Sequence, residues 1–193
     1  MKATLEQVRA RNLRTVAILA ALFLIPLVAA FLMYYGTSWR PGGHTNHGEL
    51  IEPARALPRD SAAYSADTFT HAWSLVYIGD GGCDENCRNA LYVMRQSQLA
   101  LNNDMQRVKR VFLVSANCCA QEFLAREHAG LIVINATGAA ARPLLQEFPQ
   151  QERAHTLFIV DPLGNLMMRF DIRTNPRGLR EDLAALLKLS HIG

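Results

Sequence analysis

Four cysteines are the residues in this sequence whose types and spacing could do chemistry. Cys83 and Cys87 are separated by three residues, whereas Cys118 and Cys119 are adjacent. Two thiols four positions apart in a helix project from the same face, within one turn of each other. The spacing does not match a zinc ribbon or finger. Thiol–disulfide exchange or soft-metal binding is therefore the chemistry to expect, with a structural disulfide or buried unpaired thiols as the alternative.

The stretch around Cys83 and Cys87 predicts a strand, a turn and a helix. Residues 73–78 are apolar apart from Ser74 and rich in β-forming types, and a glycine-rich turn follows at 79–82. Beyond the turn, cysteines and apolar residues recur at helical spacing, which predicts a helix from Cys83 to about residue 105. Exposed N–H groups at a helix start favour thiolate, so we expect both sulfurs to be reactive. Nearby carboxylates indicate that the turn is not fully buried.

The second pair of cysteines follows a second predicted strand, residues 110–115. In sheets of this kind, functional sites gather at the carboxyl ends of the strands, where both pairs fall. Adjacent cysteines rarely pair with each other, because the eight-membered ring departs from usual disulfide geometry. Cys118 and Cys119 therefore have three interpretations: extra metal ligands, thiols that resolve a Cys83–Cys87 disulfide, or buried small residues with no role.

The rest of the chain alternates between helix and strand patterns. Further elements are expected at 120–128 (helix), 131–136 (strand), 139–148 (helix), 155–161 (strand) and 166–170 (antiparallel strand after a turn). A last helix has an apolar face of Leu179, Leu183, Leu186 and Leu187. His128 is expected on the surface of its short helix. This order describes an α/β domain whose mixed sheet is parallel in its first half and closed by a hairpin.

The N-terminal part of the chain has the pattern of a membrane anchor. Residues 1–14 contain four basic residues and one acidic residue, and residues 15–39 contain no charge. The apolar run of 16–35 is about 30 Å long as a helix, the thickness of a bilayer core. Tyr34, Tyr35 and Trp39 form an aromatic belt at its far end. A cleavable signal peptide is the alternative, but its apolar region is usually shorter and a small-x-small site normally follows.

Charge and composition predict how the chain is placed in the cell. Basic residues before the span put residues 1–14 in the cytoplasm, so that in a bacterium the C-terminal domain lies in the periplasm, as a single-pass inner-membrane protein. Residues 40–60 form a linker in which 49–57 is an extended segment, and 61–193 form the domain. His44 and His47 could bind metal, although exposed linker histidines usually do nothing specific. The net charge of +3 lies mostly near the N-terminus and excludes a nucleic-acid stripe.

The order of elements and several motifs resemble the thioredoxin fold, and within it the Sco (SenC/PrrC) family of membrane-anchored proteins that assemble the copper site of cytochrome c oxidase. The matching parts are the single anchor, the strand WSLVYIG, the C-x3-C pair and a late histidine before FIVDPLGN. The resemblance covers residues 48–189 and implies a thioredoxin-like α/β domain with a mixed central sheet flanked by helices. This chain has CDENCR where the family usually has prolines around its motif.

The resemblance also implies a site and a partner. It makes Cys83, Cys87 and His155 the ligands of one copper ion, Cu(I) or Cu(II), consistent with the preference of thiolates for Cu(I). The implied partner is oxidase subunit II or another oxidase assembly factor. For His155, the alternative is a hydrogen-bonded residue at the end of a strand.

Three functions follow from these expectations. A copper-binding assembly factor, which is not an enzyme in the strict sense, is favoured. A thiol–disulfide oxidoreductase would act on cysteines of an oxidase subunit or another exported protein, with Cys83 as nucleophile. A non-catalytic thioredoxin-like scaffold would keep its cysteines only for stability.

Overall fold

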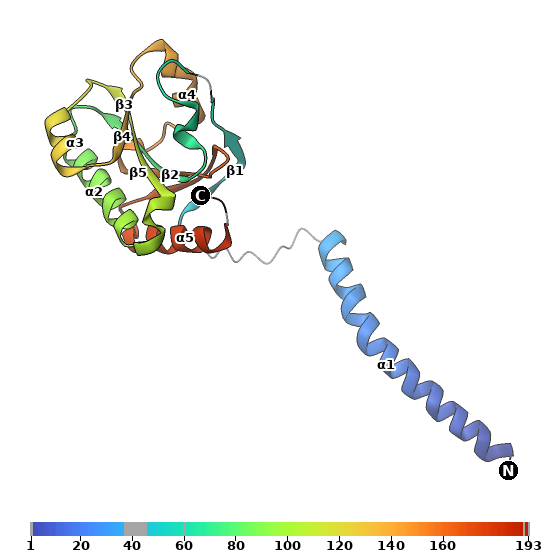
Figure 1. Cartoon of the computed structure of the whole chain (residues 1–193). Helices are drawn as coiled ribbons and strands as arrows, with labels where there is room; N and C mark the ends of the chain where they lie inside the picture. The colour runs from blue at the N-terminus through green and yellow to red at the C-terminus, as the bar shows by residue number, and fades with distance from the viewer. Residues whose placement is uncertain (1, 37–45, 60, 191, 193) are drawn as a thin grey trace. The chain divides into compact units, whose positions relative to one another are not determined.

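The computed structural model describes residues 2–36, 46–59, 61–190 and 192 of the 193-residue chain. Two compact units divide it, Met1–His44 and Thr45–Gly193. The described part of the first unit is one helix, α1 (Lys2–Gly36), which includes Pro26 (Figure 1). Its segment Arg9–Gly36 is long and apolar enough to cross a membrane. Of the three residues of the expected aromatic belt, Tyr34 and Tyr35 are exposed on α1. The third, Trp39, lies outside the described residues.

The second unit is built on one mixed sheet of six strands in the order β1-β6-β5-β2-β3-β4. The strands are β1 (Glu49–Ala56), β2 (Trp73–Asp80), β3 (Val108–Ala116), β4 (Leu131–Asn135), β5 (Thr156–Val160) and β6 (Asn165–Asp171). The pairs β2–β3 and β3–β4 are parallel, whereas β2–β5, β5–β6 and β6–β1 are antiparallel. The predicted mixed sheet, parallel in its first half and closed by a hairpin, is confirmed.

Helices cover both faces of this sheet. They are α2 (Glu85–Leu99), α3 (Gln121–Glu127), α4 (Arg142–Glu147) and α5 (Pro176–Leu189), with short 3-10 turns η1 (Ala66–Phe69), η2 (Asn102–Arg107), η3 (Ala139–Ala141) and η4 (Arg153–His155) (Figure 1). Side chains alternate across a strand, so Leu75 and Tyr77 of β2 enter the cluster that contains α2 and α5 residues. Val76 and Ile78 enter the second cluster, with α4.

The end of α2 differs from the expected boundary for a local reason. The helix expected to reach residue 105 ends at Leu99, because Asn102 has a left-handed φ of 51° and the chain continues as a 3-10 turn. The final helix forms as expected: Leu179, Leu183 and Leu187 are buried, and Leu186 is half-buried.

The expected linker at 40–60 includes a strand of the sheet, since β1 pairs with β6. The residues before β1 are fastened to α5 by Asp182, a buried carboxylate. It accepts hydrogen bonds from the backbone N–H of Gly48 (2.7 Å) and from the backbone N–H of His47 (2.9 Å to the nearer oxygen). The ring Nδ1 of His47 also lies 3.1 Å from this carboxylate. His47 is therefore engaged in fastening β1 to the domain, and His44 lies outside the described residues.

Candidate functional site

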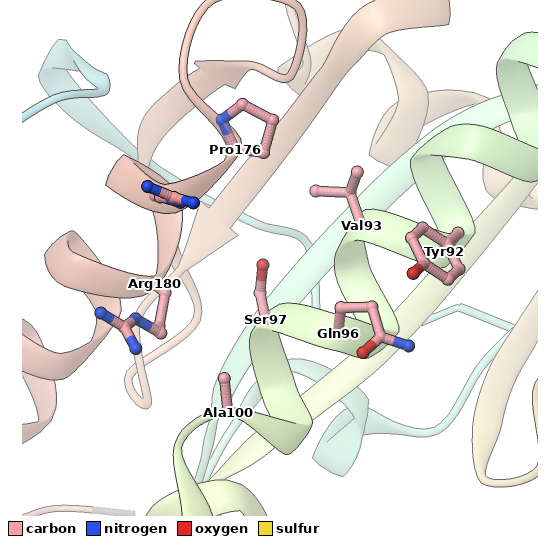
Figure 2. A pocket seen from close by; sticks show the side chains of 8 residues that line it. Tyr92, Val93, Gln96, Ser97, Ala100, Pro176 and Arg180 are labelled. Atoms are coloured by element: carbon pink, nitrogen blue, oxygen red, sulfur yellow. The ribbon is translucent and has the colours of Figure 1, made fainter.

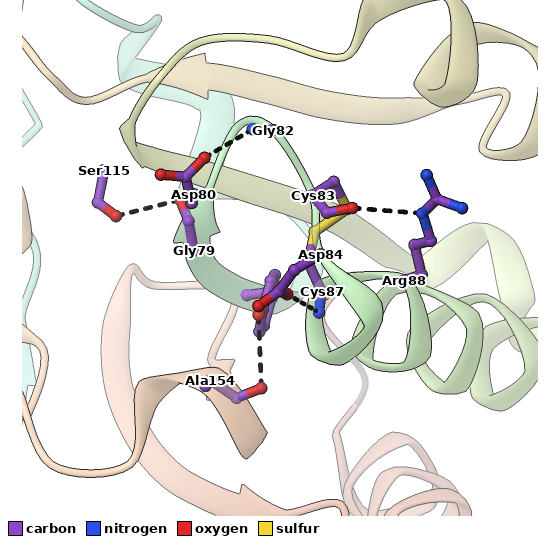
Figure 3. Close-up of a disulfide and its surroundings, with 10 residues drawn as sticks. Gly79, Asp80, Gly82, Cys83, Asp84, Cys87, Arg88, Ser115 and Ala154 are labelled. Atoms are coloured by element: carbon purple, nitrogen blue, oxygen red, sulfur yellow. Dashed lines mark hydrogen bonds between the residues drawn. A yellow bond between two sulfur atoms is a disulfide. The ribbon is translucent and has the colours of Figure 1, made fainter.

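The candidate site lies at the carboxyl ends of the adjacent strands β2 and β3. After β2, the chain turns through Gly81 and Gly82 and reaches Cys83, which forms a disulfide with Cys87 (Figure 3). The two Cα atoms are 5.0 Å apart. The cysteines are only 2% and 1% exposed, although the acidic side chains of the same turn are exposed.

A side chain between the two cysteines sets the start of α2. Asp84 is the N-cap, and its Oδ1 accepts a 2.9 Å hydrogen bond from the backbone N–H of Cys87 (Figure 3). The expectation that the helix includes both cysteines is therefore wrong. Asp84 caps the helix because a carboxylate satisfies a free N–H of the first turn and a thiol does so poorly. Cys83 therefore precedes the cap, with a positive φ of 51°. Cys87 alone lies in the first turn, where backbone N–H groups stabilise a thiolate.

Arg88 links the first pair to α3. Its Nε donates a 3.3 Å hydrogen bond to the carbonyl oxygen of Cys83 (Figure 3). Its guanidinium lies 5.1 Å from the ring centroid of Phe123 in α3. Arg88 thus places a positive charge beside the backbone of Cys83. The first turn of α2 and the side chain of Arg88 surround the pair with positive electrostatic potential. Such surroundings favour a reduced sulfur that acts as a nucleophile or binds a metal.

Tyr77 belongs to the buried surroundings of the first pair. Its ring stacks on Phe112 with centroids 5.6 Å apart, and its hydroxyl donates a 3.4 Å hydrogen bond to the carbonyl oxygen of Ala154. Burial, with a smaller contribution from the negative charge of Asp84, raises the pKa of Tyr77 to about 12. The phenol is therefore neutral at physiological pH.

His155 follows Ala154 at the end of η4 and is half-buried. Its carbonyl oxygen accepts a 3.0 Å hydrogen bond from the N–H of Ile172. With Cys83 and Cys87 joined to each other, no three His, Cys, Asp or Glu side chains within the described part of the chain assemble as a metal site.

The second pair of cysteines also forms a disulfide, between Cys118 and Cys119 in the loop after β3. The expectation that adjacent cysteines remain unpaired is wrong here. The peptide bond between them is cis, and their Cα atoms are 3.1 Å apart. Cys118 is exposed and Cys119 is half-buried.

Hydrogen bonds join the loops of the two pairs. The N–H of Gly81 donates to the carbonyl oxygen of Ala116 (2.8 Å), and the N–H of Ala120 donates to the carbonyl oxygen of Gly81 (2.7 Å). The Nδ2 of Asn117 donates a 2.7 Å hydrogen bond to a carboxylate oxygen of Asp80. The loop before the first pair and the loop containing the second pair are therefore one connected unit.

His128 lies beside the second pair and is only 6% exposed, so the expected surface position is wrong. Phe123 covers it, with the two rings 5.3 Å apart at their centroids. Burial, followed by the positive charges of Arg110 and Arg95, lowers the pKa of His128. Its Nδ1 has no hydrogen-bond partner among the described residues, and the residue borders a cavity of about 520 Å³ that Cys118 and Cys119 also line.

A different cavity, of about 410 Å³, lies between α2 and α5 (Figure 2). It is lined by Tyr92, Gln96 and Arg180, among others. Neither cysteine pair lines it, so it is separate from the candidate site.

The sheet order, the helices on both faces and a cysteine pair at the start of the helix after β2 define a thioredoxin-like domain. Residues 73–190 match the family described as the transmembrane-like, thioredoxin-like, C-terminal domain, and the chain belongs to this family. Among functionally curated proteins, none matches this sequence.

Solved structures of Sco proteins share the fold. Apo Sco1 from Thermus thermophilus has a TM-score of 0.58 and 18% identity, over 76% of this chain and 99% of that chain. Yeast Sco1 with copper bound has a TM-score of 0.55 and 12% identity, over 63% and 82%. Arabidopsis thaliana ScoI with copper bound has a TM-score of 0.52 and 13% identity, over 63% and 88%. The expected likeness to Sco proteins is thus confirmed at the level of the fold.

Proposed function

We propose that this protein is a membrane-anchored assembly factor for the copper site of cytochrome c oxidase, and that its Cys83–Cys87 pair binds Cu(I) when reduced. The observation that supports this most is the disulfide that joins Cys83, just before α2, to Cys87 in its first turn, at the carboxyl end of a central strand. Sco proteins of the same fold have been solved with copper bound. The proposal extends that property to this chain.

The chemistry of the reduced pair fits a soft metal. Reduction supplies two thiolates, which select Cu(I) over harder cations. The N–H groups of the first turn of α2 stabilise negative charge on the sulfur of Cys87, and Arg88 places a positive charge beside the backbone of Cys83. Burial of Cys83 and Cys87 would keep water away from a metal held by their sulfurs. Closing the disulfide would release the ion.

His155 is the proposed third ligand. It is the last residue of η4. The preceding residue, Ala154, accepts a hydrogen bond from Tyr77, which belongs to the buried surroundings of Cys83 and Cys87. An imidazole suits either oxidation state of copper. The proposed partner is oxidase subunit II or another oxidase assembly factor. The proposed location is the bacterial inner membrane, with residues 1–14 in the cytoplasm and the domain in the periplasm.

An anaerobic Cu(I) titration of the reduced full chain in detergent, against a competing chelator, tests this proposal. We expect one Cu(I) per chain, with binding lost in Cys83→Ser and Cys87→Ser and weakened in His155→Ala. His128→Ala is the matched histidine control and should leave binding unchanged. Tight binding that survives Cys83→Ser would contradict the proposal.

Thiol–disulfide exchange with an exported protein is a second candidate function. The structure has two disulfides at the carboxyl ends of β2 and β3, in loops that are hydrogen-bonded to each other, and this arrangement favours exchange. Cys83 is the proposed nucleophile, so Cys87→Ser should accumulate a mixed disulfide with the substrate protein, and Cys83→Ser should not. A third possibility, a scaffold without cysteine chemistry, predicts that replacing all four cysteines lowers the melting temperature but preserves function in cells.

A further inference from the structure

The two cysteine pairs differ in how well another protein can reach them. Cys83 and Cys87 are buried, so the sulfurs of this inner pair are shielded from a large reagent. In the outer pair, Cys118 is exposed and Cys119 is half-buried. The cavity of about 520 Å³ beside the outer pair is also bordered by β4, an edge strand of the sheet. A partner protein can thus approach the outer pair directly.

The outer pair also contacts the surroundings of the inner pair. Cys119 packs against the hydrophobic cluster that contains Cys83 and Cys87. The hydrogen bonds of Gly81 to Ala116 and Ala120 attach the loop of the inner pair to both sides of the outer pair. Cys118 is therefore open to solvent, whereas Cys119 packs toward the protein interior.

We propose that Cys118–Cys119 is an outer redox pair, which accepts two electrons from the dithiol of a partner protein and passes them to Cys83–Cys87. The inference rests on the proposed function, because that function needs the buried inner pair in its reduced form. It assigns to the outer pair the task of reducing the buried disulfide between Cys83 and Cys87.

The first half of the reaction reduces the outer pair. A thiolate of the partner attacks Sγ of Cys118, the Cys118–Cys119 bond breaks, and Cys119 leaves as a thiolate. The second partner thiol then attacks the partner's own sulfur in this mixed disulfide and releases Cys118. The partner departs as a disulfide, and the outer pair has gained two electrons and two protons.

The second half transfers those electrons inward. The thiolate of Cys119 attacks Sγ of Cys83, and Cys87 leaves as a thiolate. Cys118 then attacks Sγ of Cys119, which releases Cys83 and restores the Cys118–Cys119 disulfide. A thiol of lower pKa is the better leaving group, and Cys87 is the cysteine in the first turn of α2, where N–H groups stabilise its charge.

Reduction kinetics of the oxidised full chain in detergent test the transfer, with reduced thioredoxin as the protein dithiol. Thiols are alkylated at each time point and assigned by peptide mass spectrometry. In the variant Cys118→Ala/Cys119→Ala, reduction of Cys83–Cys87 should slow by about tenfold or more, because an intramolecular attack at high effective concentration is lost. An unchanged rate would overturn the proposal. Gly138→Ala, which leaves both pairs intact, is the control.

A second variant tests contact between the two pairs without a partner. Cys87→Ala/Cys118→Ala leaves only Cys83 and Cys119, and mild oxidation should join them within one chain. If the folded chain forms only intermolecular disulfides or none, the proposed transfer is ruled out. Circular dichroism checks that both double variants are folded.

Copper binding separates this inference from the proposed function. Chemically reduced Cys118→Ala/Cys119→Ala should bind Cu(I) as the wild type does, since its inner pair is intact. Slow reduction by thioredoxin together with normal copper binding supports the transfer between pairs. Slow reduction without copper binding by the wild type would still support the transfer and would contradict only the copper role.

Discussion

A Cβ atom added to Gly81 would lie 2.8 Å from the Cα atom of Cys118. It would also lie 2.5 Å from the carbonyl oxygen of Asn117. Both are backbone atoms, which cannot rotate away as the end of a side chain can. The absence of a side chain at Gly81 is thus what allows the loops of the two cysteine pairs to pack together.

Gly81→Ala should therefore push the two loops apart. We expect a loss of about 1–3 kcal/mol in the free energy of unfolding, typical of overpacking, and slower transfer between the cysteine pairs. Gly138→Ala is the matched control, because nothing lies within 4 Å of its added Cβ. Chemical denaturation, followed by the fluorescence of buried Trp73, measures the effect. Equal stability of the two variants would contradict the close packing.

Asp84→Ala should destabilise the start of α2. The variant loses the side-chain hydrogen bond to the N–H of Cys87, which should cost about 1 kcal/mol of unfolding free energy. Asp84→Asn keeps the capping oxygen and should unfold close to the wild type. Denaturation curves of the oxidised proteins compare the two. The prediction fails if asparagine is as damaging as alanine.

Tyr77 should make stability fall at high pH. Its pKa is about 12 in the folded chain and about 10 when unfolded. The unfolded state therefore loses its proton first, and the stabilisation present below pH 10 is lost as the pH rises through 12. The total loss should be about 2–3 kcal/mol, at 1.36 kcal/mol per pKa unit. Unfolding curves of wild type and Tyr77→Phe across this range should diverge; parallel curves would refute the shift.

Asp182→Ala should loosen the attachment of β1. The change leaves the buried N–H of Gly48 and the partly buried N–H of His47 without their acceptor, at a cost of about 2 kcal/mol. Glu181→Ala is the control: it removes only a 3.4 Å contact with the ring of His47 by a carboxylate that is 52% exposed, and should change stability by less than about 0.5 kcal/mol. Hydrogen exchange at β1 should rise in the first variant only. Similar exchange in both variants would show that Asp182 does not fasten the strand.

Local sequence determined the elements that present the first cysteine pair. Apolar β-forming residues predicted β2, and the glycines after them predicted the turn. Elsewhere in the chain, the spacing of the leucines in α5 predicted its buried face. Asp84 was itself a readable signal, since Asp is a preferred N-cap, and it places Cys83 before the helix. The uncharged N-terminal run likewise predicts a long apolar helix, which the structure contains.

Tertiary structure decided how the cysteine pairs relate to each other. Their proximity depends on the parallel pairing of β2 with β3. It also depends on hydrogen bonds between the loops that follow these strands, which join residues more than thirty positions apart. His128 shows the same limit: its short helix has no pattern that requires burial, and packing against Phe123 places it inside. Periodicity records which face of an element is apolar, but contacts between elements depend on how those faces pack in three dimensions.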